Sequence, residues 1–100
     1  MPIPTVIIID DNPGDIALAQ EAFAENRLAV DFIAAMSGDE ALDLLKRIGG
    51  GPILPHLILL DLNLPKINGL ELLGFIRQHP RLSQVPTVVL TTSNRTQDRE

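Results

Sequence analysis

Residues 57–65 read Leu-Ile-Leu-Leu-Asp-Leu-Asn-Leu-Pro, so that four aliphatic side chains run into a carboxylate. An apolar run this short, with Pro55 before it and Pro65 at its far end, is typical of a strand buried on both faces. Asp61 then lies at the carboxyl end of the strand, the edge at which open parallel α/β sheets bind ligands. A single aspartate in this position is more often a turn or helix-cap residue, so the case for a site depends on the other strands.

Three further segments have the apolar, β-branched composition of strands. They are residues 5–9, which end at Asp10 and Asp11, residues 29–34, which contain Asp31, and residues 85–90, which end at Thr91. The charge inside residues 29–34 predicts that this strand lies at an edge of the sheet.

Capping signals and apolar spacing predict a helix after each of the first three strands. The first has Asn12 as its cap, Pro13 in the first turn, Asp15 as a capping-box partner, and an apolar stripe of Ile16, Ala19 and Phe23 widened by Leu18 and Ala22. The second begins with the capping box at residues 37–40 and ends at the glycines 49–51. The third begins at Asn68, carries Leu72, Phe75 and Ile76 on one face, and ends at His79-Pro80.

The order βαβαβαβ predicts one α/β domain over residues 1–100, with parallel strands joined by right-handed crossovers. The absence of cysteine excludes disulfides, thiolate metal sites and a cysteine nucleophile. A net charge of −5, with three Phe and no Tyr or Trp, disfavours nucleic-acid binding and favours a divalent cation or a basic partner. No apolar run approaches the ~20 residues that span a bilayer, and no signal peptide is present, so we expect a cytoplasmic protein without membrane contact.

Parallel strands share one carboxyl edge, which should bring Asp10, Asp11 and Asp61 together, with Thr91 arriving from the fourth strand. Carboxylates this close repel unless a cation neutralises them, and Mg²⁺ suits a few carboxylates with water and a backbone carbonyl. A carboxylate beside Mg²⁺ can attack a phosphoryl group, to which a threonine hydroxyl can then donate a hydrogen bond. Each residue taken alone has an ordinary explanation as a cap, a turn residue or a β-former. The functional interpretation depends on their meeting at one edge.

Three segments together resemble the receiver domain of two-component response regulators over essentially the whole chain: residues 7–13 (IIIDDNP), residues 59–65 (LLDLNLP) with Asn68-Gly69, and residues 88–93 (VVLTTS). The resemblance implies a flavodoxin-like, doubly wound parallel sheet with strand order 2-1-3-4. Residues 12–15 and 62–66 are also similar to single-domain regulators paired with bacterial phytochromes.

The resemblance also implies a role for each site residue. Asp61 would be the phosphoacceptor for a sensor histidine kinase, and Thr91 would be the switch hydroxyl. Asp11 would bind Mg²⁺ directly, Asp10 would act largely through water, and Asn63 would contribute its backbone carbonyl. Phosphorylation would then shift a conformational equilibrium that a partner detects, which makes the chain a signalling domain rather than a turnover enzyme.

The sequence departs from the receiver pattern after its fourth strand. Receivers have a fifth strand with a phosphoryl-clamping lysine before a cis-proline, an aromatic switch residue and a final helix, and we find none of these here. Lys66 and Arg95 do not match the lysine position, and we interpret both as solvated charges. An uncovered fourth strand predicts a homodimer or an element-swapped dimer, and the missing lysine predicts weaker phosphorylation or a weaker conformational response.

The sequence leaves two alternative functions open. A phosphatase of the haloacid-dehalogenase type also uses a strand-end aspartate nucleophile with Mg²⁺, but it needs a second acid two residues later, where this chain has Asn63. A degenerate module that binds partners without phosphorylation is favoured by the missing segment and disfavoured by the intact Asp10, Asp11, Asp61 and Thr91.

Overall fold

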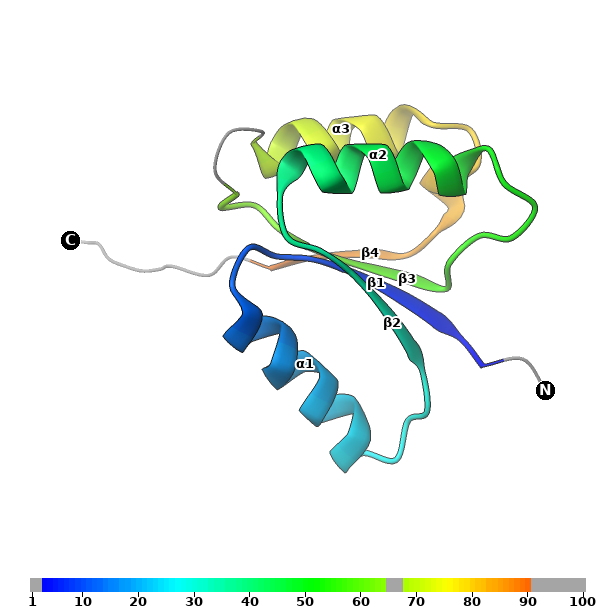
Figure 1. The fold of residues 1–100 in the computed structure, drawn as a ribbon. Coiled ribbons are helices and arrows are strands. Elements are labelled where there is room, and N and C mark those ends of the chain that lie inside the picture. Colours follow the sequence, from blue (N-terminus) through cyan, green and yellow to red (C-terminus); the bar gives the residue numbers. More distant parts are fainter. Residues whose placement is uncertain (1–2, 65–67, 91–100) are drawn as a thin grey trace.

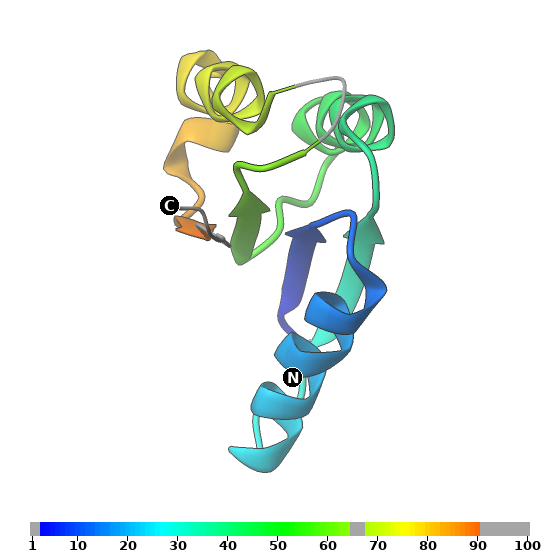
Figure 2. The same cartoon turned by 90° about the vertical axis from the view of Figure 1, so that its left-hand side faces the viewer.

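The computed structural model describes residues 3–64 and 68–90 and shows an α/β sandwich of three layers (Figure 1). Its elements in chain order are β1 (Thr5–Ile9), α1 (Pro13–Glu25), β2 (Asp31–Ala35), α2 (Gly38–Gly49), β3 (Leu57–Asp61), α3 (Gly69–Gln78), the short 3₁₀ helix η1 (Leu82–Gln84) and β4 (Thr87–Leu90). Helices α2 and α3 lie side by side on one face of the sheet, and α1 lies on the other, as the end view in Figure 2 shows.

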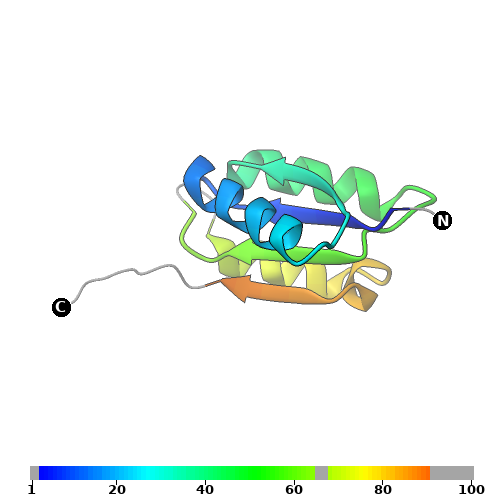
Figure 3. The ribbon, with the colours of Figure 1, turned by 90° about the horizontal axis from the view of Figure 1, so that it is seen from below.

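The four strands form one parallel sheet in the order β2-β1-β3-β4. This confirms the parallel pairing predicted from the alternation of strands and helices, and the doubly wound strand order that the receiver resemblance implies. The edge position of β2, predicted from the charge inside it, is confirmed as well. The central strands β1 and β3 are buried on both faces, since their successive side chains pack alternately against the α2/α3 layer and the α1 layer. Figure 3 shows α1 lying over β1 and β2, away from β4.

Most of the core lies between the sheet and the α2/α3 layer. Leu45 of α2 and Leu72 and Ile76 of α3 are almost fully buried there, and the predicted apolar face of α3 is thereby confirmed. The α1 layer is thinner, with Ile16 as the one buried residue of the helix and Phe23 in an edge-to-face contact with Phe32 of β2.

The predicted apolar stripe of α1 was too wide. Ile16, Ala19 and Phe23 face the sheet, whereas Leu18 is 64% exposed and Ala22 is also exposed. Leu18 lies two positions after Ile16, about 200° around the helix, and therefore points away from the packed face. The capping-box role of Asp15 was also wrong, because the backbone N–H of Asn12 donates to Asp10 instead.

Two strand boundaries differ from the predicted ranges. Strand β2 begins at Asp31 rather than at residue 29, and β4 begins at Thr87 rather than at residue 85. Pro86 has no N–H to give to the ladder, and the preceding residues 82–84 form η1, which the sequence reasoning missed. Within residues 3–64 and 68–90, no helix has the length and apolarity needed to cross a membrane.

At the amino ends of the strands, Arg81 connects the ends of helices α2 and α3. Its Nη1 donates to the carbonyl of Gly49 at 3.0 Å and also to the carbonyl of Gly51, which ties the segment after α3 to the end of α2. The Nδ1 atom of His79 accepts the backbone N–H groups of Arg81 and Leu82 at 3.1 and 3.2 Å. The two helix ends on this face are therefore fixed to each other through hydrogen bonds.

Candidate metal and phosphoacceptor site

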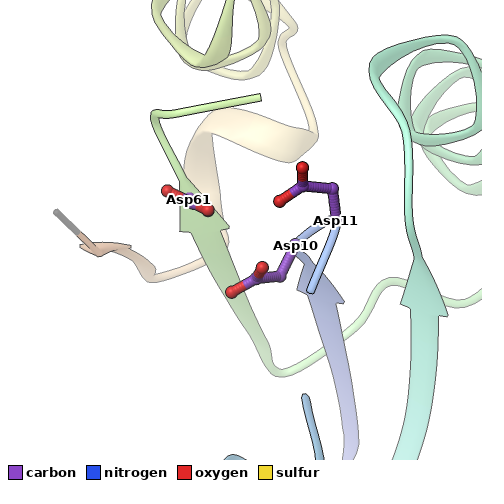
Figure 4. Close-up of side chains that lie close together, drawn as sticks. All are labelled: Asp10, Asp11 and Asp61. Atoms are coloured by element: carbon purple, nitrogen blue, oxygen red, sulfur yellow. The ribbon is translucent and has the colours of Figure 1, made fainter. Parts of the chain in front are cut away.

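Strand register brings the acidic residues together at the opposite, carboxyl edge of the sheet. Ile9 of β1 is paired with Leu60 of β3, so that Asp10 and Asp61 come next on neighbouring strands. Asp11 follows directly and points into the same space, as Figure 4 shows. One carboxylate oxygen from each of the three residues can be chosen such that all lie within 4.8 Å of one another. The predicted convergence of Asp10, Asp11 and Asp61 is therefore present in the structure.

The three carboxylates differ in their exposure to water. Asp10 is 0% exposed and Asp61 is 2% exposed, whereas Asp11 lies on the surface. The cluster thus combines two buried carboxylates with one that water can reach. Such a donor set suits a hard divalent cation that keeps part of its water shell, because carboxylate oxygens are the ligands that Mg²⁺ and Mn²⁺ accept while water fills the remaining positions.

A matching turn follows each buried aspartate. The backbone N–H of Asn12 donates to Oδ1 of Asp10 at 2.9 Å, and the backbone N–H of Asn63 donates to Oδ1 of Asp61 at 2.9 Å. Asn12 also caps α1 by accepting the N–H of Gly14. These turns, which sequence reasoning missed, fix the side-chain orientation of both acids. The repeated pattern Asp-x-Asn at residues 10–12 and 61–63 could have predicted them.

The buried carboxylate of Asp10 carries an electrostatic cost. Oδ2 of Asp10 is buried and has no hydrogen-bond partner among the residues that the structure describes. Burial raises the pKa of Asp10 from 3.8 to about 6, against the lowering effect of the N–H of Asn12, and the negative charges of Asp61, Asp15 and Asp11 raise it further. A cation bound at this oxygen would supply the missing partner and offset the repulsion.

The remaining predicted residues have different outcomes. Asn63 lies two residues after the end of β3 and contributes the N–H described above. Thr91, Lys66 and Arg95 lie outside the described residues.

A surface hollow of about 560 Å³ lies next to the cluster and is lined by residues from the β3–α3 connection, Leu62, Asn63, Leu64, Asn68 and Leu70. A hollow of similar size, about 590 Å³, lies between the end of α1 and the start of β2, away from the acids.

A parallel sheet in the order 2-1-3-4 with an acidic cluster at its carboxyl edge defines a flavodoxin-like α/β domain with a candidate divalent-cation site. A family model described as the response regulator receiver domain matches residues 6–100. The chain therefore belongs to the receiver-domain family of two-component response regulators. Receiver domains are signalling modules that bind Mg²⁺ or Mn²⁺ in an acidic pocket, and Asp10, Asp11 and Asp61 form such a cluster here.

Several individual response regulators are similar to this chain in sequence or in structure. Response regulator Rcp1 of Synechocystis sp. is 38% identical over 100 residues, covering 97% of this chain and 67% of Rcp1. The structure of the phosphorylated cyanobacterial phytochrome response regulator RcpA is similar with a TM-score of 0.80 at 39% identity, covering 92% of this chain and 67% of RcpA. The Mn²⁺-bound form of Rcp1 is similar with a TM-score of 0.79 at 36% identity, covering 92% and 68% of the two chains. This chain thus spans about two thirds of the length of these relatives.

Proposed function

We propose that this chain is a Mg²⁺-dependent phosphoacceptor that receives a phosphoryl group on Asp61 from a sensor histidine kinase. The observation that carries the proposal is the meeting of three carboxylates from two strand ends, with Asp10 and Asp61 buried. Membership of the receiver family supports the same function. The phosphorylated form would differ in conformation from the unmodified form, and a partner would respond to that difference.

The residues present fit a divalent cation. Asp11 and Asp61 would hold it through their carboxylates, Asp10 largely through water, and Asn63 through its backbone carbonyl. The buried, unpartnered Oδ2 of Asp10 supports this assignment, because a water molecule held by the cation could donate a hydrogen bond to it while the positive charge offsets that of the carboxylate. When bound, the cation supplies positive charge that offsets the repulsion between the carboxylates and an incoming phosphate.

The transfer step requires one nucleophile and one leaving group. A carboxylate oxygen of Asp61 attacks the phosphorus of a phosphohistidine on the kinase, so that a P–O bond forms as the P–N bond breaks. The leaving imidazole takes up a proton from solvent, and Asp61 becomes an acyl phosphate. The N–H of Asn63, 2.9 Å from Oδ1, holds the carboxylate in a fixed orientation for this attack. Thr91 would donate its hydroxyl to a phosphoryl oxygen and thereby link phosphorylation to the conformational change.

The comparisons suggest a more specific partner. RcpA is a phytochrome response regulator, and its similarity to this chain supports a kinase linked to a phytochrome photoreceptor. We place the chain in the cytoplasm, the compartment typical of receiver domains. Incubation with a purified phytochrome kinase and radiolabelled ATP would test the pairing. Transfer of label from the kinase to this chain supports it, and label that stays on the kinase contradicts it.

The phosphoacceptor role is tested without a kinase. The chain is incubated with acetyl phosphate, with and without Mg²⁺, and its intact mass is measured alongside Asp61→Asn and the control Asp39→Asn, which changes an exposed acid of α2. We expect one Mg²⁺-dependent phosphoryl adduct in the wild type and in Asp39→Asn and none in Asp61→Asn. An adduct that persists in Asp61→Asn, or no adduct in the wild type, would overturn the proposal. Continuous release of phosphate over many turnovers would instead favour a phosphatase.

A further inference from the structure

Helix α3 begins in direct contact with the backbone of the phosphoacceptor strand. Gly69 is buried, and its N–H donates to the carbonyl of Leu62 at 3.3 Å. A β-carbon on Gly69 would lie 2.7 Å from the carbonyl oxygen of Asp61 and 2.9 Å from the carbonyl carbon of Leu62, and closer still to the Cα of Leu62. The neighbours are all backbone atoms, which cannot rotate away as the end of a flexible side chain can.

The backbone that Gly69 contacts connects two residues of the acidic site. Leu62 lies between Asp61 and Asn63, and the N–H of Asn63 holds Oδ1 of Asp61 at 2.9 Å. A side chain at position 69 would have to push the peptide between Asp61 and Leu62 away from the helix. That displacement changes the orientation of the Asp61 carboxylate and the position of the Asn63 carbonyl together, whereas Asp10 and Asp11, which follow β1, are not among the nearest atoms that the β-carbon would meet.

We propose that Gly69 is a positioning residue for the acidic site, because the absence of its side chain fixes where the end of β3 lies relative to the end of β1. The inference rests on the proposed function, since it assumes that Asp61 and Asn63 act with Asp10 and Asp11 on one cation. It assigns to the first residue of α3 a role beyond helix initiation. The N-cap function at this helix end belongs to Asn68, whose side chain accepts the N–H of Leu70.

Two other glycines provide matched controls. A β-carbon on Gly74, in the same helix, would meet none of the described residues outside the backbone of that helix within 4 Å. A β-carbon on Gly49 would lie 2.6 Å from Nε2 of His79, so that Gly49→Ala should disturb packing at the amino edge of the sheet, far from the acids. Gly74→Ala therefore controls for the substitution itself, and Gly49→Ala controls for loss of stability alone.

The test measures Mn²⁺ binding by isothermal titration calorimetry for the wild type and the three alanine variants, together with thermal unfolding of each without metal. We expect Gly69→Ala to weaken Mn²⁺ binding by roughly tenfold or more, the size typical of changes in residues that support metal ligands. Gly49→Ala should lower the unfolding temperature and keep the wild-type affinity, and Gly74→Ala should keep both affinity and fold. If Gly69→Ala is unfolded at the assay temperature, binding is measured in the Gly69→Ala, Gly74→Ala double variant with sucrose, which favours the folded state.

The possible results separate this inference from the proposed function. If the wild type binds Mn²⁺ and folded Gly69→Ala binds it with the same affinity, the positioning role is overturned and the proposed function stays intact. A wild type that binds no Mn²⁺ would overturn the metal site, and the positioning role with it. If the double variant also stays unfolded, Gly69 is a requirement for folding and the positioning role is overturned as well.

Discussion

Replacing Asp10 by Asn should stabilise the metal-free protein at neutral pH. Asp10 is 0% exposed, and its Oδ2 is buried without a hydrogen-bond partner among the described residues. Asn has nearly the same shape, and its side-chain oxygen can still accept the N–H of Asn12 that Asp10 accepts now. The substitution therefore removes a buried negative charge and preserves the turn into α1.

The magnitude follows from the raised pKa of Asp10. The folded protein holds this proton up to about pH 6, whereas the unfolded chain releases it near 3.8. Below pH 3.8 the group is protonated in both states and adds no pH dependence. As the pH rises from 3.8 to 6 the wild type loses stability, and above that it carries the full cost of the charge. A tenfold change in proton affinity corresponds to ~1.4 kcal/mol, so that this cost is on the order of 3 kcal/mol.

The assay is urea denaturation of both proteins in EDTA from pH 4 to pH 8. We expect the two free energies of unfolding to be similar near pH 4, and Asp10→Asn to be more stable by ~2–3 kcal/mol at pH 7. Asp11→Asn is the control, because Asp11 is exposed and its neutralisation relieves little desolvation. Saturating Mg²⁺ should stabilise the wild type more than Asp10→Asn. A variant no more stable than the wild type at pH 7, or a difference independent of pH, would refute the reasoning.

Three further outcomes follow from other parts of the fold. Arg81→Ala removes two charge-assisted hydrogen bonds, to the carbonyl of the last residue of α2 and to that of Gly51, and should lower the free energy of unfolding by ~2–3 kcal/mol in urea denaturation. Arg77→Ala, at an exposed position, should change it by less than ~0.5 kcal/mol. Leu45→Ala, at a fully buried position, should cost ~2–5 kcal/mol by the same measurement. Val88 of β4 is 47% exposed, and we expect light scattering at tens of micromolar to show a dimer that Val88→Lys weakens; a monomeric wild type would contradict this.

The sheet and the acidic cluster were predictable because both follow from short-range patterns. Buried parallel strands have continuous apolar runs, and such runs end in aspartate at residues 9–10 and 60–61. Once helices separate the strands, parallel pairing puts all their carboxyl ends on one edge. The meeting of Asp10 and Asp61 therefore requires no knowledge of side-chain packing. It requires only that Ile9 and Leu60 are in register, which the structure shows.

The features that sequence reasoning missed depend on contacts between distant segments. Apolar residues occur on more than one side of α1, and the exposure of Leu18 becomes evident only when the structure shows that Ile16, Ala19 and Phe23 face the sheet. Gly69 is an ordinary helix-start glycine in the sequence, yet its packing against the end of β3 leaves no room for a side chain. Arg81 lies 30 residues from Gly51, and no local pattern indicates the hydrogen bond between them.

The residues at the carboxyl ends of the strands and those at the amino ends affect the stability of the fold in opposite directions. At the carboxyl edge, Asp10 and Asp61 are buried close together, and burial raises the pKa of Asp10, so that the negative charge on Asp10 opposes folding in the absence of a cation. At the amino edge, Arg81 and His79 satisfy backbone groups at the ends of α2 and α3. A cation or a neutralising substitution acts only on the first edge, and so should raise stability without altering the second. Asp10→Asn and Arg81→Ala should therefore have additive effects on the free energy of unfolding, because they lie at opposite ends of the strands and share no partner. Strong coupling between the two substitutions would contradict this prediction, and would mean that a change at one end of the strands alters the energetics at the other end.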